Sequence, residues 1–215
     1  HLILAGLLGT ATALPASTLY WDGNDTTADA NGGAGTWDTT ANNWDDAATA
    51  GSPVIWNNAT PDSAIFGGTA GTVTLGTAIT ADSLQFDTTN YVVSGNTLTL
   101  AGSATITANA TKATITSIID GSSGLTKEGT SALYLTGANT YTGATNINSG
   151  TLWLGNGGTG GSLNTASAIN IASGATFRTA QSDDITQGTD FSGAAITGDG
   201  GITHNNNGGT LILNA

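Results

Sequence analysis

Few residues of this chain could carry out chemistry. Its 215 residues include no Cys, and its two His stand far apart, at positions 1 and 204. The absence of Cys excludes cysteine nucleophiles and thiolate zinc sites, and two His leave little room for a His-ligated metal. No Gly-x-Ser-x-Gly segment is present, and no Asp/His partnership can be argued for any Ser. The sequence therefore indicates no catalytic residue, and we expect a structural role for His204.

An adjacent carboxylate pair, Asp183–Asp184, stands close to Arg178 in the sequence. Paired carboxylates are the working groups of many polysaccharide-cleaving enzymes. Neighbouring residues of a strand point to opposite faces, however, so this pair could share a site only in a turn. Lys112, Lys127 and Arg178 are also too few to bind a polyanionic sugar. We expect a solvated loop here, and a polysaccharide-degrading β-helix enzyme is a distant alternative.

Oxygen ligands of the kind that calcium prefers stand near the start of the chain, at Asp22, Asp25 and Asp29, among Gly and Asn residues. The segment lacks the later Glu of the twelve-residue calcium loop. A solvated acidic loop is therefore the favoured interpretation, and a calcium site in the Asp22–Asp29 region is the alternative. We expect no other cofactor or metal.

The charged residues limit the partners of this chain. Its net charge is −12, its pI is about 4.1, and only 8% of its residues are charged. A phosphate backbone or an anionic membrane surface is bound through cations, so we expect neither nucleic acid nor membrane as a partner. Lys127 and Glu128 are adjacent, and we expect them to form an exposed, weakly stabilising charge pair at a turn.

Four of the five tryptophans, Trp21, Trp37, Trp44 and Trp56, lie within residues 17–66. The pattern of this segment is irregular, so we interpret it as a cap or entry module. We expect the indole rings to cover the open end of a repeat structure, where a large apolar plate would shield the first coil. A platform for stacking on sugar rings is the alternative.

Beyond Gly71, short strand candidates such as residues 72–75, 97–100 and 151–154 alternate with Gly, Asn or Ser turns. Apolar residues alternate with Thr, Ser or Asn inside them, which is typical of a strand with one buried face. Such short strands favour an all-β fold, a parallel β-helix (β-solenoid), over a sandwich. Charged side chains would stack like on like and repel in this fold, which explains their scarcity.

Internal repeats support the solenoid. The string Ile119–Lys127 matches Ile196–His204 at a constant offset of 77 (198 − 121), and both copies precede a Leu-x-Leu strand candidate. We expect residues 67–215 to form some six or seven coils of roughly 20 to 25 residues each, stacked about 4.7–4.8 Å apart.

Residues Ile119 to Gly155 resemble the autotransporter-associated β-strand repeat of bacterial surface proteins. The residues that carry the resemblance are Gly124, Leu125, Leu133, Leu135, Gly137, Asn139, Tyr141, Gly143, Gly150, Leu152 and Leu154. The resemblance implies a right-handed β-helix that is displayed outside the cell and serves adhesion, aggregation or structural display. Ser123 and Ser131 stand where the repeat usually has Gly. No translocator follows, so we expect a passenger fragment or a self-contained secreted protein.

The first sixteen residues are apolar and uncharged, and they are too few for a comfortable membrane span. No Lys or Arg precedes them, so we expect a retained strand and not a cleaved leader. This strand would either fold back on its own chain or add to a neighbouring subunit. The residues expected to link subunits are Leu2, Ile3, Leu4, Leu7 and Leu8.

These observations predict a non-enzymatic, extracellular structural protein at the bacterial cell surface. The main hypothesis is a self-assembling filament or surface-layer-type subunit, in which head-to-tail strand donation joins each copy to the next. The alternative is an autotransporter-like passenger adhesin that binds cell-surface or matrix polysaccharide.

Overall fold

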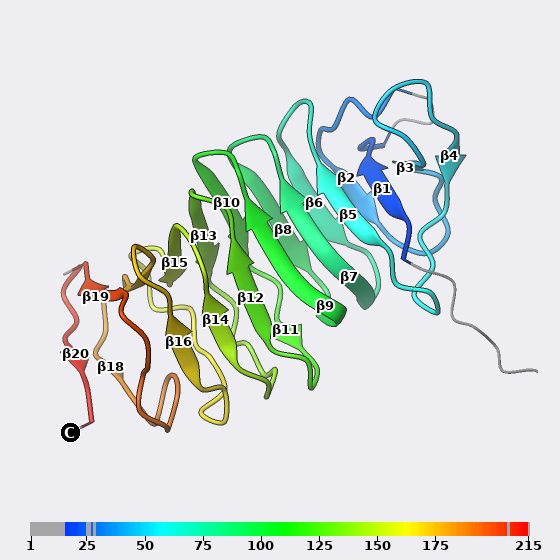
Figure 1. Ribbon diagram of the computed structural model, residues 1–215. Helices are drawn as coiled ribbons and strands as arrows, with labels where there is room; N and C mark the ends of the chain where they lie inside the picture. The colour runs from blue at the N-terminus through cyan, green and yellow to red at the C-terminus, as the bar shows by residue number, and fades with distance from the viewer. Residues whose placement is uncertain (1–15, 25–26, 28, 206, 215) are drawn as a thin grey trace, which may run out of the picture.

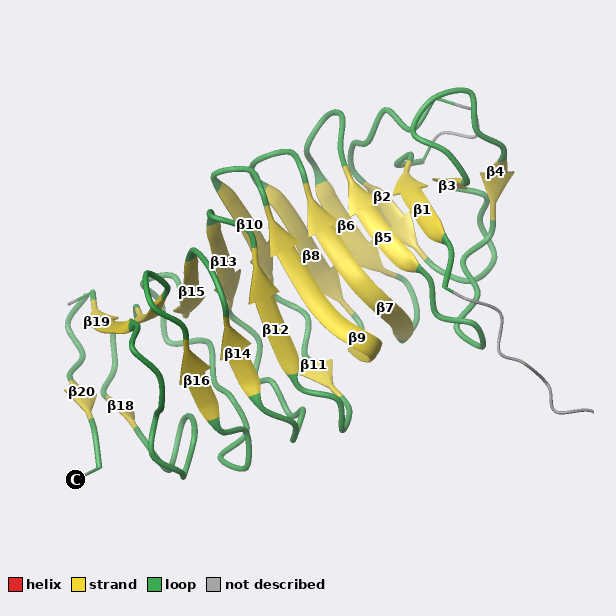
Figure 2. Cartoon of the chain, in the orientation of Figure 1, coloured by secondary structure: helices red, strands yellow, loops and turns green. Residues whose placement is uncertain are grey.

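The computed structural model describes residues 16–24, 27, 29–205 and 207–214. The described residues contain strands and turns but no helix, and they form a parallel β-solenoid of about seven turns (Figures 1 and 2). No helix in this part of the chain is long and apolar enough to cross a membrane. The expected all-β parallel solenoid is therefore confirmed.

One side of the solenoid is a ten-stranded sheet. Its strands are β1 (Thr18–Trp21), β3 (Trp44–Asp45), β4 (Pro53–Val54), β5 (Ser63–Phe66), β7 (Ile79–Phe86), β9 (Leu98–Ala108), β11 (Ile119–Asp120), β12 (Leu125–Glu128), β14 (Thr145–Ile147) and β16 (Ile169–Ile171). They lie in the order β16-β14-β12-β9-β7-β5-β1-β3-β4, with β11 also beside β9. All pairs are parallel except β1 with β3 and β3 with β4.

An eight-stranded sheet forms the facing side (Figure 1). Its strands are β2 (Gly35–Trp37), β6 (Thr72–Leu75), β8 (Tyr91–Gly95), β10 (Lys112–Ile115), β13 (Ala132–Leu135), β15 (Thr151–Leu154), β17 (Thr176–Thr179) and β19 (Gly201–His204). Every second strand of the chain therefore belongs to the same sheet through most of the solenoid. A separate pair, β18 (Ile185–Thr186) with β20 (Leu211–Ile212), lies at the C-terminal end.

Equivalent apolar side chains stack on one another from coil to coil. Leu133 is the register partner of Leu152, which in turn pairs with Phe177, and all three are fully buried. Successive coils here differ by 19 (152 − 133) and 25 (177 − 152) residues. Because inward side chains alternate with outward ones along each strand, every coil adds its apolar face to one continuous core.

The sheets continue across Gly67, where we expected the cap to end. β5 pairs in parallel with β1 on one side and with β7 on the other, so β1 and β5 are ordinary rungs of the ten-stranded sheet. At the N-terminal end, the short strands β3 and β4 depart from the solenoid pattern, because they pair antiparallel (Figure 2). Pro53 on the terminal strand β4 blunts that edge, since Pro has no amide hydrogen to offer a further strand.

The four tryptophans of residues 17–66 form one cluster inside this end. Their exposed fractions are at most 1%, and the ring centroids of Trp37 lie 4.9 Å from Trp44 and 4.7 Å from Trp56. The ring centroids of Trp21 and Trp44 are 5.0 Å apart, and the two rings meet edge to face at 68°. Because every ring is covered by protein, none of the four offers a face on which a sugar could stack.

The prediction of an exposed charge pair at Lys127 and Glu128 is wrong, because Lys127 is buried. It alternates with Thr126 along β12, so it faces inward, between Ile106 and Ile147 in the register, and it is fully buried. Its Nζ donates to the carbonyl oxygens of Glu128 and Gly129 at 2.6 and 2.8 Å. A third bond goes to the carbonyl of Ser149, at 3.2 Å, in the next coil. Burial lowers the pKa of this ammonium group to about 8, although Glu128 opposes the shift.

Candidate functional site

The outer face of the eight-stranded sheet carries a continuous stack of two cations and two aromatic rings. The rings of Tyr134 and Trp153 are nearly parallel, with centroids 4.9 Å apart. The Nζ of Lys112 lies 4.5 Å from the centroid of Tyr134, and the guanidinium carbon of Arg178 lies 4.6 Å from that of Trp153. Both distances are within the range of cation–π attraction. We call these four residues the cation–aromatic stack.

The register of the solenoid builds this stack from four successive coils. Tyr134, Trp153 and Arg178 are Cα partners across β13, β15 and β17. Each lies between two inward residues, as Trp153 lies between the buried Leu152 and Leu154, so it must face outward. On β10 the register partner of Tyr134 is Thr114, and Lys112 stands two residues before it, on the same outward face, and reaches the ring of Tyr134 diagonally.

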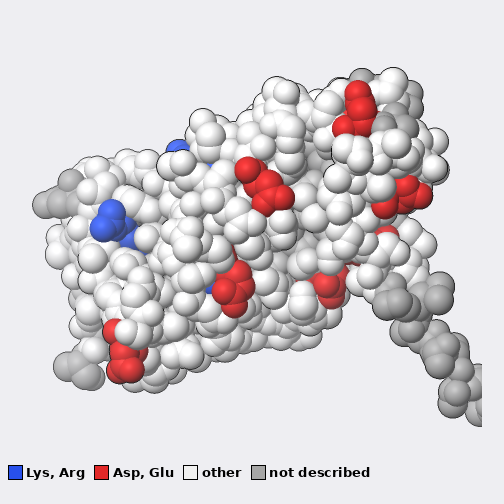
Figure 3. All heavy atoms as spheres, turned by 45° about the horizontal axis from the view of Figure 1, so that its top comes forward, with Lys and Arg blue, Asp and Glu red and all other residues white. Residues whose placement is uncertain are grey.

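The two cations of the stack are not neutralised by carboxylates in the described part of the chain. The Nε of Arg178 donates to Thr203 Oγ1 at 2.7 Å, which leaves the terminal amino groups of its guanidinium for solvent. Burial raises the pKa of Tyr134, while Arg178 opposes that rise. On the face shown in Figure 3, acidic groups lie at several separate places and cationic groups at few. The stack is thus a local cationic site on an acidic protein.

A shelf of small residues runs beside the stack. The neighbouring outward column consists of Ala132, Thr151, Thr176 and Gly201, which are register partners from β13 to β19. The edges of the two rings therefore stand above a low strip along the solenoid axis. Such an arrangement can bind an anionic group through the cations and an apolar C–H surface through the rings.

The apolar residues of the predicted repeat lie in the core. Leu133, Leu135, Leu152 and Leu154 are fully buried, and Leu125 is only 1% exposed. Ile202, which matches Leu125 at the offset of 77, lies in the other sheet, since β12 and β19 belong to different sheets. The matching strings are therefore not equivalent rungs of the solenoid.

Asn139 and Tyr141 form buried side-chain hydrogen bonds within the repeat. The Asn139 Oδ1 accepts the amide of Ile119 at 3.0 Å, and its Nδ2 donates to the carbonyl oxygens of Gly137 and Ser162, both at 2.9 Å. One buried amide thus joins three coils. Tyr141 is buried with its hydroxyl 2.7 Å from Thr145 Oγ1, and this burial raises its pKa.

The repeat glycines stand where coils approach one another closely. A Cβ on Gly124 would lie 2.0 Å from the carbonyl oxygen of Ala144, and one on Gly143 would lie 2.2 Å from the amide nitrogen of Gly124. Gly137 is similarly close to Ser117, at 2.5 Å. Gly150 has φ of +66°, a conformation that glycine adopts readily, and also lacks room for a side chain.

The acidic candidates do not converge on a common site. Asp22 Oδ1 accepts the amide of Asn31 at 2.9 Å, Asp29 accepts from Thr27, and Asp25 lies outside the described residues. Asp183 and Asp184 are exposed in the loop between β17 and β18, as expected for a solvated loop. Among the described residues, no three His, Cys, Asp or Glu side chains gather in a way that could hold a metal ion.

Two remaining predicted sites lie at the ends of the chain. His204 is held between Thr179 Oγ1, 2.8 Å from its Nδ1, and the carbonyl of Gly209, 2.9 Å from its Nε2. The carbonyl accepts only, so Nε2 carries the proton. Leu2, Ile3, Leu4, Leu7 and Leu8, expected to link subunits, lie outside the described residues.

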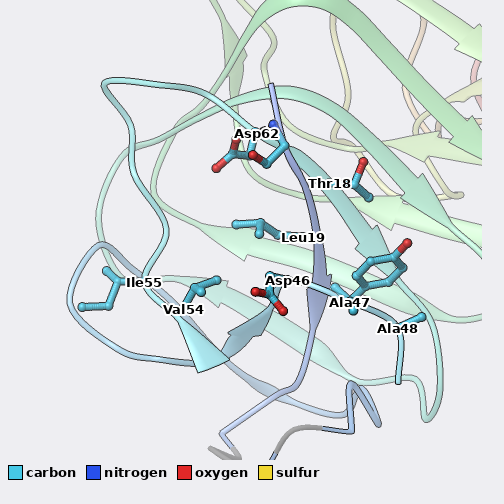
Figure 4. A pocket seen from close by; sticks show the side chains of 10 residues that line it. Thr18, Leu19, Asp46, Ala47, Ala48, Val54, Ile55 and Asp62 are labelled. Carbon is cyan, nitrogen blue, oxygen red and sulfur yellow. Dashed lines mark hydrogen bonds between the residues drawn. The ribbon is translucent and has the colours of Figure 1, made fainter. Parts of the chain in front are cut away.

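A hollow of about 580 Å³ opens beside β1 and β4 (Figure 4). Leu19, Val54 and Ile55 give it apolar walls, and the carboxylates of Asp46 and Asp62 stand at its margin. Both carboxylates accept backbone amides, those of Ser52 and Ser17 respectively. The two acids therefore serve the local fold.

Sequence reasoning alone missed the cation–aromatic stack. The sequence feature that could have revealed the stack is the spacing of Tyr134, Trp153 and Arg178. These residues lie on successive coils, 19 (153 − 134) and 25 (178 − 153) residues apart, and each occupies an outward position of its strand. The varying coil length hides this spacing until the register is known.

Comparisons with known proteins give one family and one relative. Residues 125–154 match the family described as Passenger-associated-transport-repeat. The Adhesin BmaC autotransporter of Brucella suis biovar 1 (strain 1330) is 45% identical over 177 residues, which are 81% of this chain. The chain spans 5% of the length of that relative. No solved structure matches the chain.

Proposed function

Given that this chain carries the passenger repeat of autotransporters, we propose that it is a non-enzymatic, extracellular segment of an adhesin. In this role the solenoid is a rigid shaft that holds contact surfaces away from the cell. The partner is cell-surface or matrix polysaccharide, and the cation–aromatic stack is the contact surface with the chemistry to bind it.

The observation that carries the proposal is the similarity to the Brucella adhesin over 81% of this chain, combined with the partly exposed stack. The Leu, Gly and Asn residues of the repeat have structural roles in the core and at the corners of the coils. Four outward side chains from four coils, aligned on one face, stabilise the sheet through their cross-strand contacts. They also present two cations and two ring edges to a ligand, which supports a binding role.

An adhesion assay tests this function. Beads coated with the purified chain should be retained on cultured epithelial cells several-fold more than beads coated with the same chain after heat unfolding. Removal of the cell-surface glycans with glycosidases should abolish the difference. Equal retention of folded and unfolded chain would overturn the adhesive function.

Self-assembly into filaments, the main hypothesis from the sequence, stays a prediction. The apolar segment expected to join subunits lies outside the described residues. If it links copies, the full chain should form uniform rods in negative stain and a chain without residues 1–16 should not. Rods of unchanged length and number after this deletion would contradict strand donation by the segment.

A further inference from the structure

We propose that the cation–aromatic stack binds a glycan bearing isolated carboxylate groups, with Lys112 and Arg178 as the anion contacts. This inference rests on the proposed adhesive function and names the ligand class for it. The glycan would lie along the solenoid axis, on the shelf of small residues, with its C–H surfaces against the edges of Tyr134 and Trp153.

The charges needed for this contact are available. The chain has three cationic residues, and Lys127 is buried against carbonyl oxygens, so Lys112 and Arg178 carry the positive charge of the surface. Neither forms an ion pair with a carboxylate of the described residues. Arg178 uses only Nε for Thr203, and its two terminal amino groups can bind a carboxylate in the bidentate geometry that guanidinium favours.

The distance between the two cations favours a glycan whose carboxylates are widely spaced. Lys112 and Arg178 stand on β10 and β17, with β13 and β15 between them. At a strand spacing of about 4.8 Å the two strands are roughly 14 Å apart. A densely charged polymer would place many further anions against a protein of net charge −12. Isolated carboxylates avoid that repulsion, because distant protein charges are screened beyond about 8 Å at physiological salt.

The rings add contacts that a bare anion site lacks. Tyr134 and Trp153 cover one another's faces, and the cations cover the outer faces, so the rings offer their edges to a ligand. The neighbouring Ala132 and Thr151 are small, which leaves the edges accessible from the side. A sugar chain can therefore contact both rings while its carboxylates reach the two cations.

Calorimetric titration with galacturonan oligomers tests this proposal, because esterification changes the charge of the oligomer and keeps its backbone. The full chain should bind half-methyl-esterified oligomers. It should bind fully esterified, neutral oligomers at least tenfold more weakly. Lys112→Gln should weaken binding about tenfold, as expected for one charge-assisted hydrogen bond. Arg178→Gln should weaken it by at least as much, because it removes a bidentate contact. Thr107→Ala, on the outer face of the ten-stranded sheet, is the matched control and should bind as the unchanged chain does.

Several results would overturn the proposal. These are absence of binding to half-esterified oligomers, equal binding of the neutral ester, tighter binding of heparin, or full binding by both Gln variants. Circular dichroism of each variant establishes that it is folded. If the variants adhere to cells as the unchanged chain does, the ligand assignment fails while the adhesive function stands. If the unchanged chain does not adhere, the adhesive function itself fails.

Discussion

At the scale of single residues, Lys127 is the side chain whose environment differs most from its type. A long cationic residue occupies an inward position between two isoleucines, where its ammonium group binds three carbonyl oxygens at the corner between the sheets. The alternation Leu125-Thr126-Lys127 does predict an inward Lys. The adjacent Glu128 suggested a surface charge pair instead, because Lys is rarely buried without polar partners and the sequence does not show the carbonyl oxygens that bind it.

Replacement of this residue should destabilise the protein. Lys127→Met keeps the apolar stem but removes the donors for the carbonyl oxygens of Glu128, Gly129 and Ser149. We expect a loss of about 2 kcal/mol in the free energy of unfolding, measured with urea. Lys112→Met, on the outer face, is the control and should lose less than about 1 kcal/mol. Equal effects of both changes would contradict the structural role of the buried ammonium group.

The lowered pKa of Lys127 also predicts a pH dependence. Its pKa is about 8 in the folded chain and 10.5 when unperturbed, so between these values the unfolded chain binds more protons. Stability should therefore rise with pH above about 8, by about 1–2 kcal/mol up to pH 9.5. Urea unfolding at several pH values measures this rise, and Lys127→Met should lack it. A fall in the stability of the unchanged chain relative to the variant over this range would refute the assignment.

At the scale of the elements, close contact between coils determines where glycine is required. Gly124→Ala would bring a Cβ within 2.0 Å of a carbonyl oxygen in the next coil, so β12 and β14 must move apart. We expect a loss of about 1–3 kcal/mol, typical of overpacking. Gly158→Ala is the matched control, because its Cβ would meet nothing closer than 3.8 Å. A thermal unfolding curve of Gly124→Ala that overlays the unchanged one would be inconsistent with this packing.

The strands and their buried faces could be predicted from the sequence, since apolar residues alternate with polar ones in Thr151–Leu154 and Thr176–Thr179. The partners of the strands could not. A coil of 19 residues follows Leu133 and one of 25 follows Leu152, so a constant period misplaces the later coils. Because the coil length varies, the two sequence segments that match at an offset of 77 residues lie on different sheets. The stack on the outer face depends on the register and was missed with it.

At the scale of the whole molecule, the two ends of the solenoid differ in packing. The N-terminal end encloses the tryptophan cluster, whereas Ile212 and Leu213 of the last coil are 44% and 47% exposed. Because each coil contacts only its neighbours, a poorly covered end should open independently. Hydrogen exchange should therefore be faster at the amides of β18 and β20 than at those of β13 and β15. Uniform protection along the solenoid would argue against independent opening.

The most direct test of the account is the quenching of Trp153 fluorescence by ions of opposite charge. Trp153 is partly exposed and the other four indoles are at most 1% exposed, so collisional quenching reports on the cation–aromatic stack. Although the protein carries a net charge of −12, the ratio of iodide to caesium quenching should be higher for Trp153 than for a free indole, because Lys112 and Arg178 attract anions to this face. Arg178→Gln should reduce that ratio. A ratio of iodide to caesium quenching below that of a free indole would contradict the claim that this face receives anionic ligands.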